Sequence, residues 1–390
     1  MRVLKFFLIS VVSMLSFSCE SVDTPVVDDG TGSDNTTPDV NVPSVLTLDA
    51  DTFYIKADGV DKSDFVVSLD GVALTEGYTI SQIVSGQLQD YNDDGWTSSV
   101  EAEARFVAFY EKDGERLESS IITVKAVGYD VPATVADPKP SCYDFVRRIF
   151  MTQFTGTECI NCPDMKKEIV TFLSKESNSS KAVLASIHSG NFTESDPARI
   201  DVPLDAAMGA NVKPALVLDF NNTSSYQLVF GDGFPTKLSQ NFDRLYNNSP
   251  ALAGMSVNSV IVGDKLRAKV SVKVAESSVF RVGAWILEDG IEGIQKGAPD
   301  DSYNIHNNCV RAVDSEAVPG TDYSGYSLGQ LEKGGRAEYV FEFDIDQKWV
   351  LDNCRLVVFV TVPNTRGDKY FVNNVIDCGF LTGQKQYDYK

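Results

Sequence analysis

The stretch Thr155-Gly156-Thr157-Glu158-Cys159-Ile160-Asn161-Cys162-Pro163 joins two different hydrophobic patterns. Before it, residues 148–155 form an apolar run that predicts a buried strand. A second apolar run, residues 182–188, predicts another. Between the two runs, Met165, Ile169 and Leu173 recur every four residues, which is typical of one face of an amphipathic helix. The order strand, helix, strand predicts a parallel pair of strands in an α/β layer.

A C-x-x-C pair at a strand-to-helix junction resembles the thioredoxin-like arrangement. There the first cysteine lies at a helix N-terminus, where the partial positive charge of the free N–H groups favours a thiolate. The resemblance implies Cys159 as nucleophile and Cys162 as the residue that resolves a mixed disulfide. It also implies that Pro235, in Phe234-Pro235-Thr236, is the cis-proline that faces the pair.

Glu158 departs from that pattern, because a carboxylate beside the nucleophile disfavours the thiolate. Three interpretations of the pair therefore remain open: an active thiol–disulfide oxidoreductase, a purely structural disulfide, or half of a zinc site. The zinc interpretation lacks a second pair of ligands at the required spacing. His188 and His306 are interpreted as structural histidines rather than catalytic ones.

The first residues form a basic start and a short apolar run, which indicates a signal peptide over residues 1–18. Cys19 follows a small residue, as in the lipobox of bacterial lipoproteins, although Ser16 replaces the usual leucine. We expect Cys19 to be acylated, with an ordinary cleaved signal peptide as the alternative. Residues 19–42 are acidic and poor in apolar side chains, so they predict a tether that also resembles a surface-export signal. The expected location is the outer membrane, on its periplasmic or cell-surface face.

In residues 43–131, apolar and polar residues alternate in short stretches separated by Asp-Gly turns, which predicts a small β-sandwich. This part of the sequence resembles bacterial immunoglobulin-like domains. One loop in it matches the pattern of a calcium-binding loop, with oxygen ligands Asp90, Asn92, Asp94 and Glu101. The segment that follows is a strand pattern rather than a helix, so an ordinary acidic loop is the alternative. No other cofactor is expected.

A proline-rich linker precedes residues 141–248, the predicted thioredoxin-like domain. In residues 249–390, apolar and polar residues alternate again, as in β-strands. The predicted fold class is therefore multidomain: an immunoglobulin-like β-sandwich, a thioredoxin-like α/β domain and a C-terminal β-sandwich. Cys354 and Cys378 are equally distant from residue 366, so a hairpin without a bulge predicts a disulfide between them. The pairing of Cys142 and Cys309 is left open.

Composition excludes several classes of partner. The 34 basic and 55 acidic residues give a net charge of −21, which argues against nucleic acid and against anionic membrane surfaces as ligands. Only two histidines leave little room for histidine-rich metal sites. The oligomeric state is not predicted.

Several short motifs together resemble the Bacteroidetes outer-membrane lipoproteins related to the twenty-eight-kilodalton outer membrane protein. They are the lipobox, Thr155-Gly156 before the C-x-x-C, Gly233-Phe234-Pro235-Thr236, and Leu287-Glu288-Asp289-Gly290-Ile291 with Gln295. That resemblance implies a membrane-associated, adhesive role. Two hypotheses follow: a lipid-anchored protein that binds a protein or glycan ligand, or a tethered oxidoreductase that uses Cys159 and Cys162.

Overall fold

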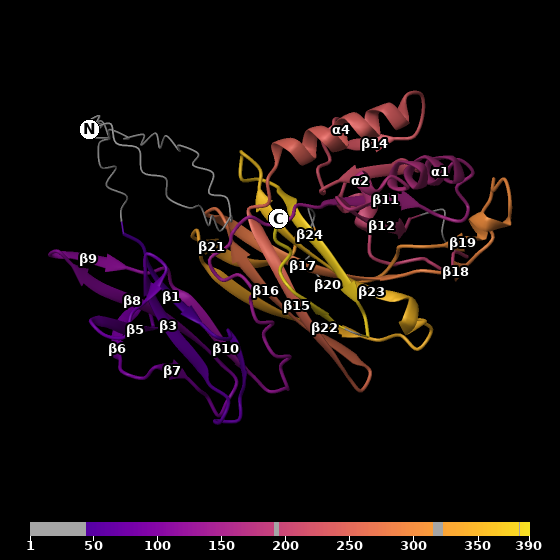
Figure 1. The fold of residues 1–390 in the computed structure, drawn as a ribbon. Coiled ribbons are helices and arrows are strands. Elements are labelled where there is room, and N and C mark those ends of the chain that lie inside the picture. Colours follow the sequence, from indigo (N-terminus) through magenta and orange to yellow (C-terminus); the bar gives the residue numbers. More distant parts are fainter. Residues whose placement is uncertain (1–43, 191–194, 315–322, 382) are drawn as a thin grey trace, which may run out of the picture. The chain divides into compact units, whose positions relative to one another are not determined.

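The computed structural model describes residues 44–190, 195–314, 323–381 and 383–390. The predicted signal peptide, Cys19 and the acidic tether lie outside the described residues. Within the described part, the chain is rich in β-strands, which form several sheets, and has few helices (Figure 1). None of its helices there is both long enough and apolar enough to cross a membrane.

Residues 44–127 form two sheets that enclose one hydrophobic core. The strands are β1 (Leu46–Ala50), β2 (Tyr54–Lys56), β3 (Ser63–Leu69), β4 (Val72–Ala73), β5 (Tyr78–Val84), β6 (Gln87–Tyr91), β7 (Gly95–Trp96), β8 (Ala102–Lys112), β9 (Glu115–Glu118) and β10 (Ile122–Val127). One sheet has the order β1-β3-β4 with β7 beside β3, and the other has the order β2-β10-β8-β5-β6 with β9 beside β8. The predicted alternation is confirmed in β10, where Ile122, Val124 and Ala126 are buried.

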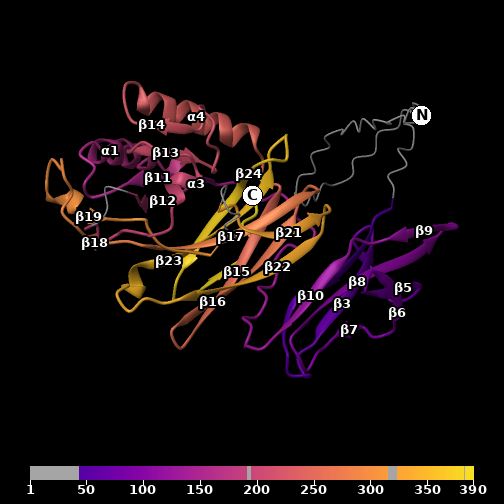
Figure 2. The ribbon, with the colours of Figure 1, turned by 180° about the vertical axis from the view of Figure 1, so that it is seen from behind.

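The next part contains the strand–helix–strand unit that the sequence predicts. Its elements are β11 (Ile149–Thr155), α1 (Cys162–Leu173), α2 (Glu176–Ser179), β12 (Ala182–His188), α3 (Leu204–Ala207), β13 (Ala215–Leu218), β14 (Gln227–Val229) and α4 (Phe234–Asn248). Strands β11 and β12 are parallel, while β13 runs antiparallel to β11 and β14 antiparallel to β13. Helices α1 and α4 cover the same face of these strands, with Phe172 of α1 against Phe242 of α4 (Figures 1 and 2).

Helix α1 begins where its sequence allows. Cys162 is its first residue, and Pro163 occupies the first turn, where a missing N–H has no helical partner to lose. Met165 and Ile169 are buried against the strands, as their spacing predicts. This fixes the C-x-x-C at the point where the chain leaves β11 and enters the helix.

The remaining strands are β15 (Ala253–Val262), β16 (Lys265–Val274), β17 (Ser278–Glu288), β18 (Ile291–Glu292), β19 (Ile305–His306), β20 (Cys309–Asp314), β21 (Tyr326–Leu331), β22 (Arg336–Asp344), β23 (Cys354–Pro363), β24 (Tyr370–Gly379) and β25 (Gln384–Lys385). Two short 3-10 turns, Asp301–Asn304 and Leu351–Asn353, lie among them. Strands β22-β16-β15-β25 form one sheet, whose apolar face packs on β17 and β23. This is the sandwich packing that the alternation predicts.

One sheet crosses the predicted boundary between residues 248 and 249. Its order is β14-β13-β11-β12-β20-β17-β23-β24, with β21 beside β17. The link is short, because Ser186 of β12 pairs in parallel with Cys309 of β20. The predicted α/β and C-terminal parts are therefore joined by backbone hydrogen bonds as well as by side-chain packing.

The predicted disulfide between Cys354 and Cys378 is wrong: both are free, buried thiols. Strands β23 and β24 do form the predicted hairpin, but Pro363 pairs with Tyr370, which is one residue off the predicted register, and a bulge at Asn373 of β24 adds a second. Cys378 therefore faces Leu356 rather than Cys354.

Candidate functional site

Cys159 and Cys162 form a disulfide at the N-terminus of α1. Both are buried, with 8% of Cys159 and 1% of Cys162 exposed. The loop between them folds as a tight turn, in which the N–H of Cys162 donates to the carbonyl of Cys159. Ile160, between the two cysteines, is by contrast 67% exposed. The structure thus brings the two predicted residues together but leaves little sulfur surface open.

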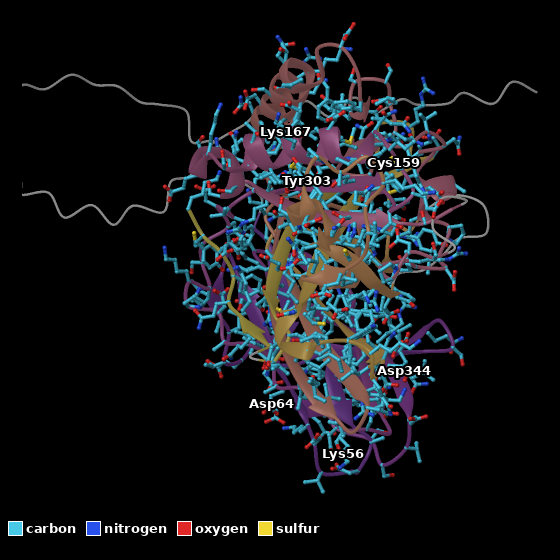
Figure 3. The ribbon with its side chains drawn as sticks, turned by 90° about the vertical axis from the view of Figure 1, so that its right-hand side faces the viewer. Lys56, Asp64, Cys159, Lys167, Tyr303 and Asp344 are labelled. Carbon is cyan, nitrogen blue, oxygen red and sulfur yellow. A yellow bond between two sulfur atoms is a disulfide. The ribbon has the colours of Figure 1, made fainter. Side chains whose placement is uncertain are left out.

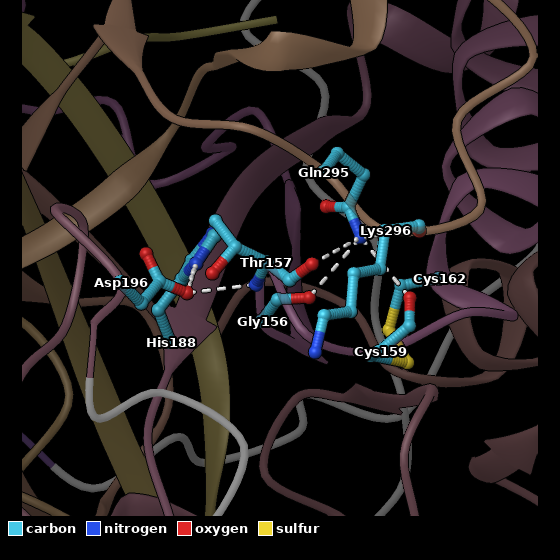
Figure 4. The surroundings of a disulfide bond; sticks show 8 residues. All are labelled: Gly156, Thr157, Cys159, Cys162, His188, Asp196, Gln295 and Lys296. Carbon is cyan, nitrogen blue, oxygen red and sulfur yellow. Dashed lines mark hydrogen bonds and ion pairs between the residues drawn. A yellow bond between two sulfur atoms is a disulfide. The ribbon is translucent and has the colours of Figure 1, made fainter.

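A segment from the C-terminal part, residues 295–297, packs on the backbone of the loop that holds this disulfide, and we call it the covering segment (Figure 4). The side-chain amide nitrogen of Gln295 lies 3.0 Å from the carbonyl oxygen of Cys159 and 3.1 Å from that of Thr157. The backbone N–H of Lys296 donates to the same Thr157 carbonyl. Gly297 packs so closely on Ile160 that an added Cβ would lie 2.4 Å from the Ile160 carbonyl oxygen. Sequence patterns gave no sign of these contacts, because Gln295 is far from the C-x-x-C in the chain.

The carboxylate of Glu158, next to Cys159 in the chain, has a cationic partner. Its carboxylate forms an ion pair with Lys296 at 2.8 Å. The hydrogen bond and the charge of Lys296 lower the pKa of Glu158. The negative charge that the sequence places beside Cys159 is therefore balanced by a cation from the covering segment.

The predicted role of Pro235 is wrong. Pro235 is an exposed residue in the first turn of helix α4, where proline is common because no helical hydrogen bond is lost. The cis peptide bond of the described residues is Lys213–Pro214, just before β13. Because Ala215 pairs with Phe154, the register places Pro214 beside Thr155, at the end of β11 that leads to the C-x-x-C.

His188 and Asp196 form a buried pair that the sequence analysis did not identify. Nδ1 of His188 lies 2.8 Å from Oδ2 of Asp196, and the same oxygen accepts a hydrogen bond from the N–H of Thr157. Burial alone would raise the pKa of Asp196, but the hydrogen bonds from His188 and from the backbone lower it to about 2. The pair therefore connects the end of β12 to the loop before Cys159 (Figure 4).

Cys309, whose pairing the sequence left open, is a free thiol in the interior. Its sulfur lies 3.8 Å from Nε2 of His188, on the side opposite Asp196. Burial raises the pKa of the Cys309 thiol. His306 packs edge-on against His188, with ring centroids 5.2 Å apart. Both histidines are thus enclosed by structure, as their interpretation as structural residues requires.

The four predicted calcium ligands are not gathered around one point. Asp94 is ion-paired with Lys62, and Glu101 accepts a hydrogen bond from the N–H of Gly128. Asp90 lies within β6, paired with Ser81 of β5, and Asn92 follows that strand. Among the described residues, no group of three or more His, Cys, Asp or Glu side chains is arranged to hold a metal ion.

Comparison with known proteins gives a likeness of fold. No family model matches the chain, and no curated protein matches it. The solved structure of HBP35 of Porphyromonas gingivalis is similar with a TM-score of 0.50 and 17% sequence identity, covering 60% of this chain and 76% of that one. A solved protein of Agrobacterium tumefaciens is 14% identical with a TM-score of 0.37, covering 62% of this chain and 97% of that chain. At 17% identity the first likeness concerns the fold alone.

Proposed function

We propose that this chain is an exported protein, anchored to the outer membrane by a lipid on Cys19, which binds a protein or glycan ligand through its β-sheets. In this proposal the α/β part is a thioredoxin-like domain that serves as a scaffold. Its Cys159–Cys162 disulfide is structural rather than catalytic. The resemblance of the sequence to Bacteroidetes outer-membrane lipoproteins supports the location and the binding role.

The observation that carries the proposal is the cover over the disulfide. In thiol–disulfide exchange, the thiolate of the substrate or reductant must reach a sulfur atom of the disulfide along the S–S bond. Here Cys159 is 8% exposed, and its carbonyl is held by Gln295 from a segment more than a hundred residues away in the chain. A disulfide enclosed in this way fits a cross-link better than a reactive centre.

An insulin-reduction assay on the purified protein with dithiothreitol as reductant tests this assignment. We expect the wild type and the Cys159→Ser variant to give the same background rate, while a known oxidoreductase in a parallel reaction precipitates insulin. Turnover by the wild type that Cys159→Ser abolishes would overturn the scaffold role and establish the enzyme.

The oxidoreductase remains the second candidate because one feature favours it. Cys159 lies three residues before Cys162, the first residue of α1, near the helix N-terminus whose dipole stabilises a thiolate, and Pro214 lies beside this loop by register. For this function the covering segment would have to move before a partner sulfur reaches Cys159.

The anchor is tested separately in cells. We expect a Cys19→Ala variant to lose incorporation of an alkyne-tagged fatty acid and to move from the membrane to the soluble fraction. A variant that keeps the label would show that Cys19 is not the acylated residue, whatever the outcome of the insulin assay.

A further inference from the structure

A small cavity lies between the N-terminal half of α1 and the strands beneath it. Its volume is about 70 Å³. It is lined by residues of β11, α1 and β12 and of the chain from 295 to 308, and it lies next to Cys162. At roughly 15 Å³ for each enclosed water molecule, it has room for about four waters or for one ligand of similar size.

The polar groups at this cavity are unusual for so acidic a chain. No aspartate or glutamate is among the residues that line it, all of which belong to the described part, although the chain carries a net charge of −21. Lys166 supplies a cation instead, and two histidines and several amide side chains supply further donors. Six polar side chains that line the cavity are more than nine-tenths buried: Gln153, Thr155, Ser186, His188, Gln295 and His306.

Several donors at the cavity have no full set of acceptors. Lys166 Nζ donates to the carbonyl of Ile305 at 2.8 Å, which leaves two of its three N–H bonds. The side-chain oxygen of Asn308 accepts from Arg355, so its NH₂ group is left as a donor. Gln153 likewise uses its oxygen, as acceptor for Ser186 at 3.5 Å, and keeps its NH₂ group. Buried donors of this kind are normally satisfied by a ligand or by ordered water.

His306 adds a donor that depends on pH. Its Nε2 lies 2.9 Å from the carbonyl oxygen of Gly293, so this nitrogen must carry the proton and Nδ1 is the one that gains a proton on acidification. Burial lowers the pKa of His306 and the hydrogen bond to the Gly293 carbonyl raises it; His188 and Lys166 lower it further, while Asp196 raises it. Cys309, near His188, is held neutral by burial.

We propose that this cavity binds one small oxyanion of the size of acetate or bicarbonate, with Lys166 as its counter-ion and the amides of Gln153 and Asn308 as hydrogen-bond donors. A planar anion of this kind accepts from several donors at once and balances the charge of the half-buried Lys166. This binding site is independent of the function proposed for the disulfide.

Calorimetric titration of the full-length protein with acetate and with bicarbonate, at constant ionic strength made up with chloride, tests the site. We expect saturable binding of acetate or bicarbonate. Lys166→Gln should weaken that binding about tenfold or more, since it removes a charge-assisted hydrogen bond. Lys167→Gln is the matched control, because Lys167 is the next residue on α1 but is exposed and does not line the cavity (Figure 3).

A second readout separates binding from folding. A bound anion should raise the pKa of His306, seen as an upward shift in the NMR titration of its ring proton when acetate or bicarbonate is added. The wild-type protein alone decides this point, so a Lys166→Gln variant that fails to fold does not remove the test. Absence of saturable binding by the wild type, an unmoved His306 titration, or equal affinities for wild type and folded Lys166→Gln would overturn the proposal.

Discussion

Asp196 is the single residue on which the loop before Cys159 depends most. Its carboxylate accepts hydrogen bonds from the N–H of Thr157, from the N–H of Ala198 and from the ring of His188, each at 2.8 or 2.9 Å. Side-chain atoms of both His188 and Asp196 are almost wholly enclosed. A buried carboxylate with three donors is stabilised in its charged form, which explains its low pKa.

The low pKa of Asp196 predicts an acid-dependent contribution to stability. The folded value of about 2 lies below the ordinary value of 3.8, so the contribution is complete above about pH 4 and is lost as the pH falls through 2. Asp196→Asn should lower the free energy of unfolding at pH 7 by about 2 kcal/mol. Urea unfolding of both proteins at several pH values measures this. The difference should narrow towards pH 2, and a difference that stays constant would contradict the assignment.

For single residues, the sequence predicts which side chains belong to the site better than which residues they contact. The C-x-x-C spacing beside a predicted helix identifies Cys159 and Cys162, and this is a local property of the chain. The His188–Asp196 pair and the cover by Gln295 depend on how distant segments meet, and no spacing encodes that. A short motif points to Pro235 as the cis-proline, whereas the conformation of a peptide bond depends on its surroundings in the fold, and the cis bond precedes Pro214.

Among the elements, the connection between β17 and β20 is the one that shapes the site. It contains the small β18–β19 pair and carries Gln295, Lys296 and His306. Lys166 of α1 holds its far end through the carbonyl of Ile305. Because one element supplies the cover of the disulfide and part of the cavity wall, a change in the cover should alter both.

Gln295→Ala should make the disulfide easier to reduce. The amide nitrogen of Gln295 lies between 3.0 and 3.3 Å from carbonyl oxygens of Gly156, Thr157 and Cys159, and alanine would remove these hydrogen bonds, while each carbonyl keeps one backbone N–H donor. At about 0.5 to 1.5 kcal/mol for each hydrogen bond lost, local opening should become about tenfold more frequent. The rate of reduction by a water-soluble phosphine, followed by mass spectrometry of trapped thiols, measures the effect.

The control for this experiment is Gln330→Ala, because Gln330 is exposed on β21 and bonds only to the surface residue Glu332 among the described contacts. It should reduce at the wild-type rate. If Gln295→Ala also reduces at that rate, the covering segment does not protect the disulfide, and the structural assignment of the C-x-x-C loses its main support.

The elements also show why patterns predict strands better than their pairing. Strand β12 has the predicted bounds, and β11 begins one residue later than its predicted run, at Ile149, because an apolar run records which residues are buried. Pairing depends on details that alternation does not contain. The pairing next to the turn is displaced by one residue and the bulge at Asn373 of β24 adds another, so Cys378 lies opposite Leu356 and a disulfide expected from symmetric spacing misses by two residues.

For the molecule as a whole, one sheet extends across the predicted domain boundary between residues 248 and 249, so the parts on either side of it share backbone pairing and packing. The face of β11 and β12 opposite the helices packs on the C-terminal strands, with Phe150 against Trp285 at 5.1 Å and against Phe359 at 5.6 Å between ring centroids. Asn374 of β24 also accepts a hydrogen bond from the N–H of Arg148. Near residue 249 the sequence changes from continuous apolar strands to strands in which apolar and polar residues alternate. The apolar runs of β11 and β12 predict that both faces are buried, but they do not predict which segments bury them.

This packing predicts that residues 141–248 do not fold alone. Removing the C-terminal strands would expose Phe150, Phe154 and Ile187, each of which is fully buried, and would leave β12 as an unpaired edge. A polypeptide of residues 141–390 keeps these contacts and should melt in one cooperative thermal transition by circular dichroism. The 141–248 polypeptide should show no such transition and should bind a hydrophobic dye. A cooperative melt of the shorter polypeptide would mean that the α/β part is an independent domain after all, joined to its neighbour by a contact that its own stability does not require.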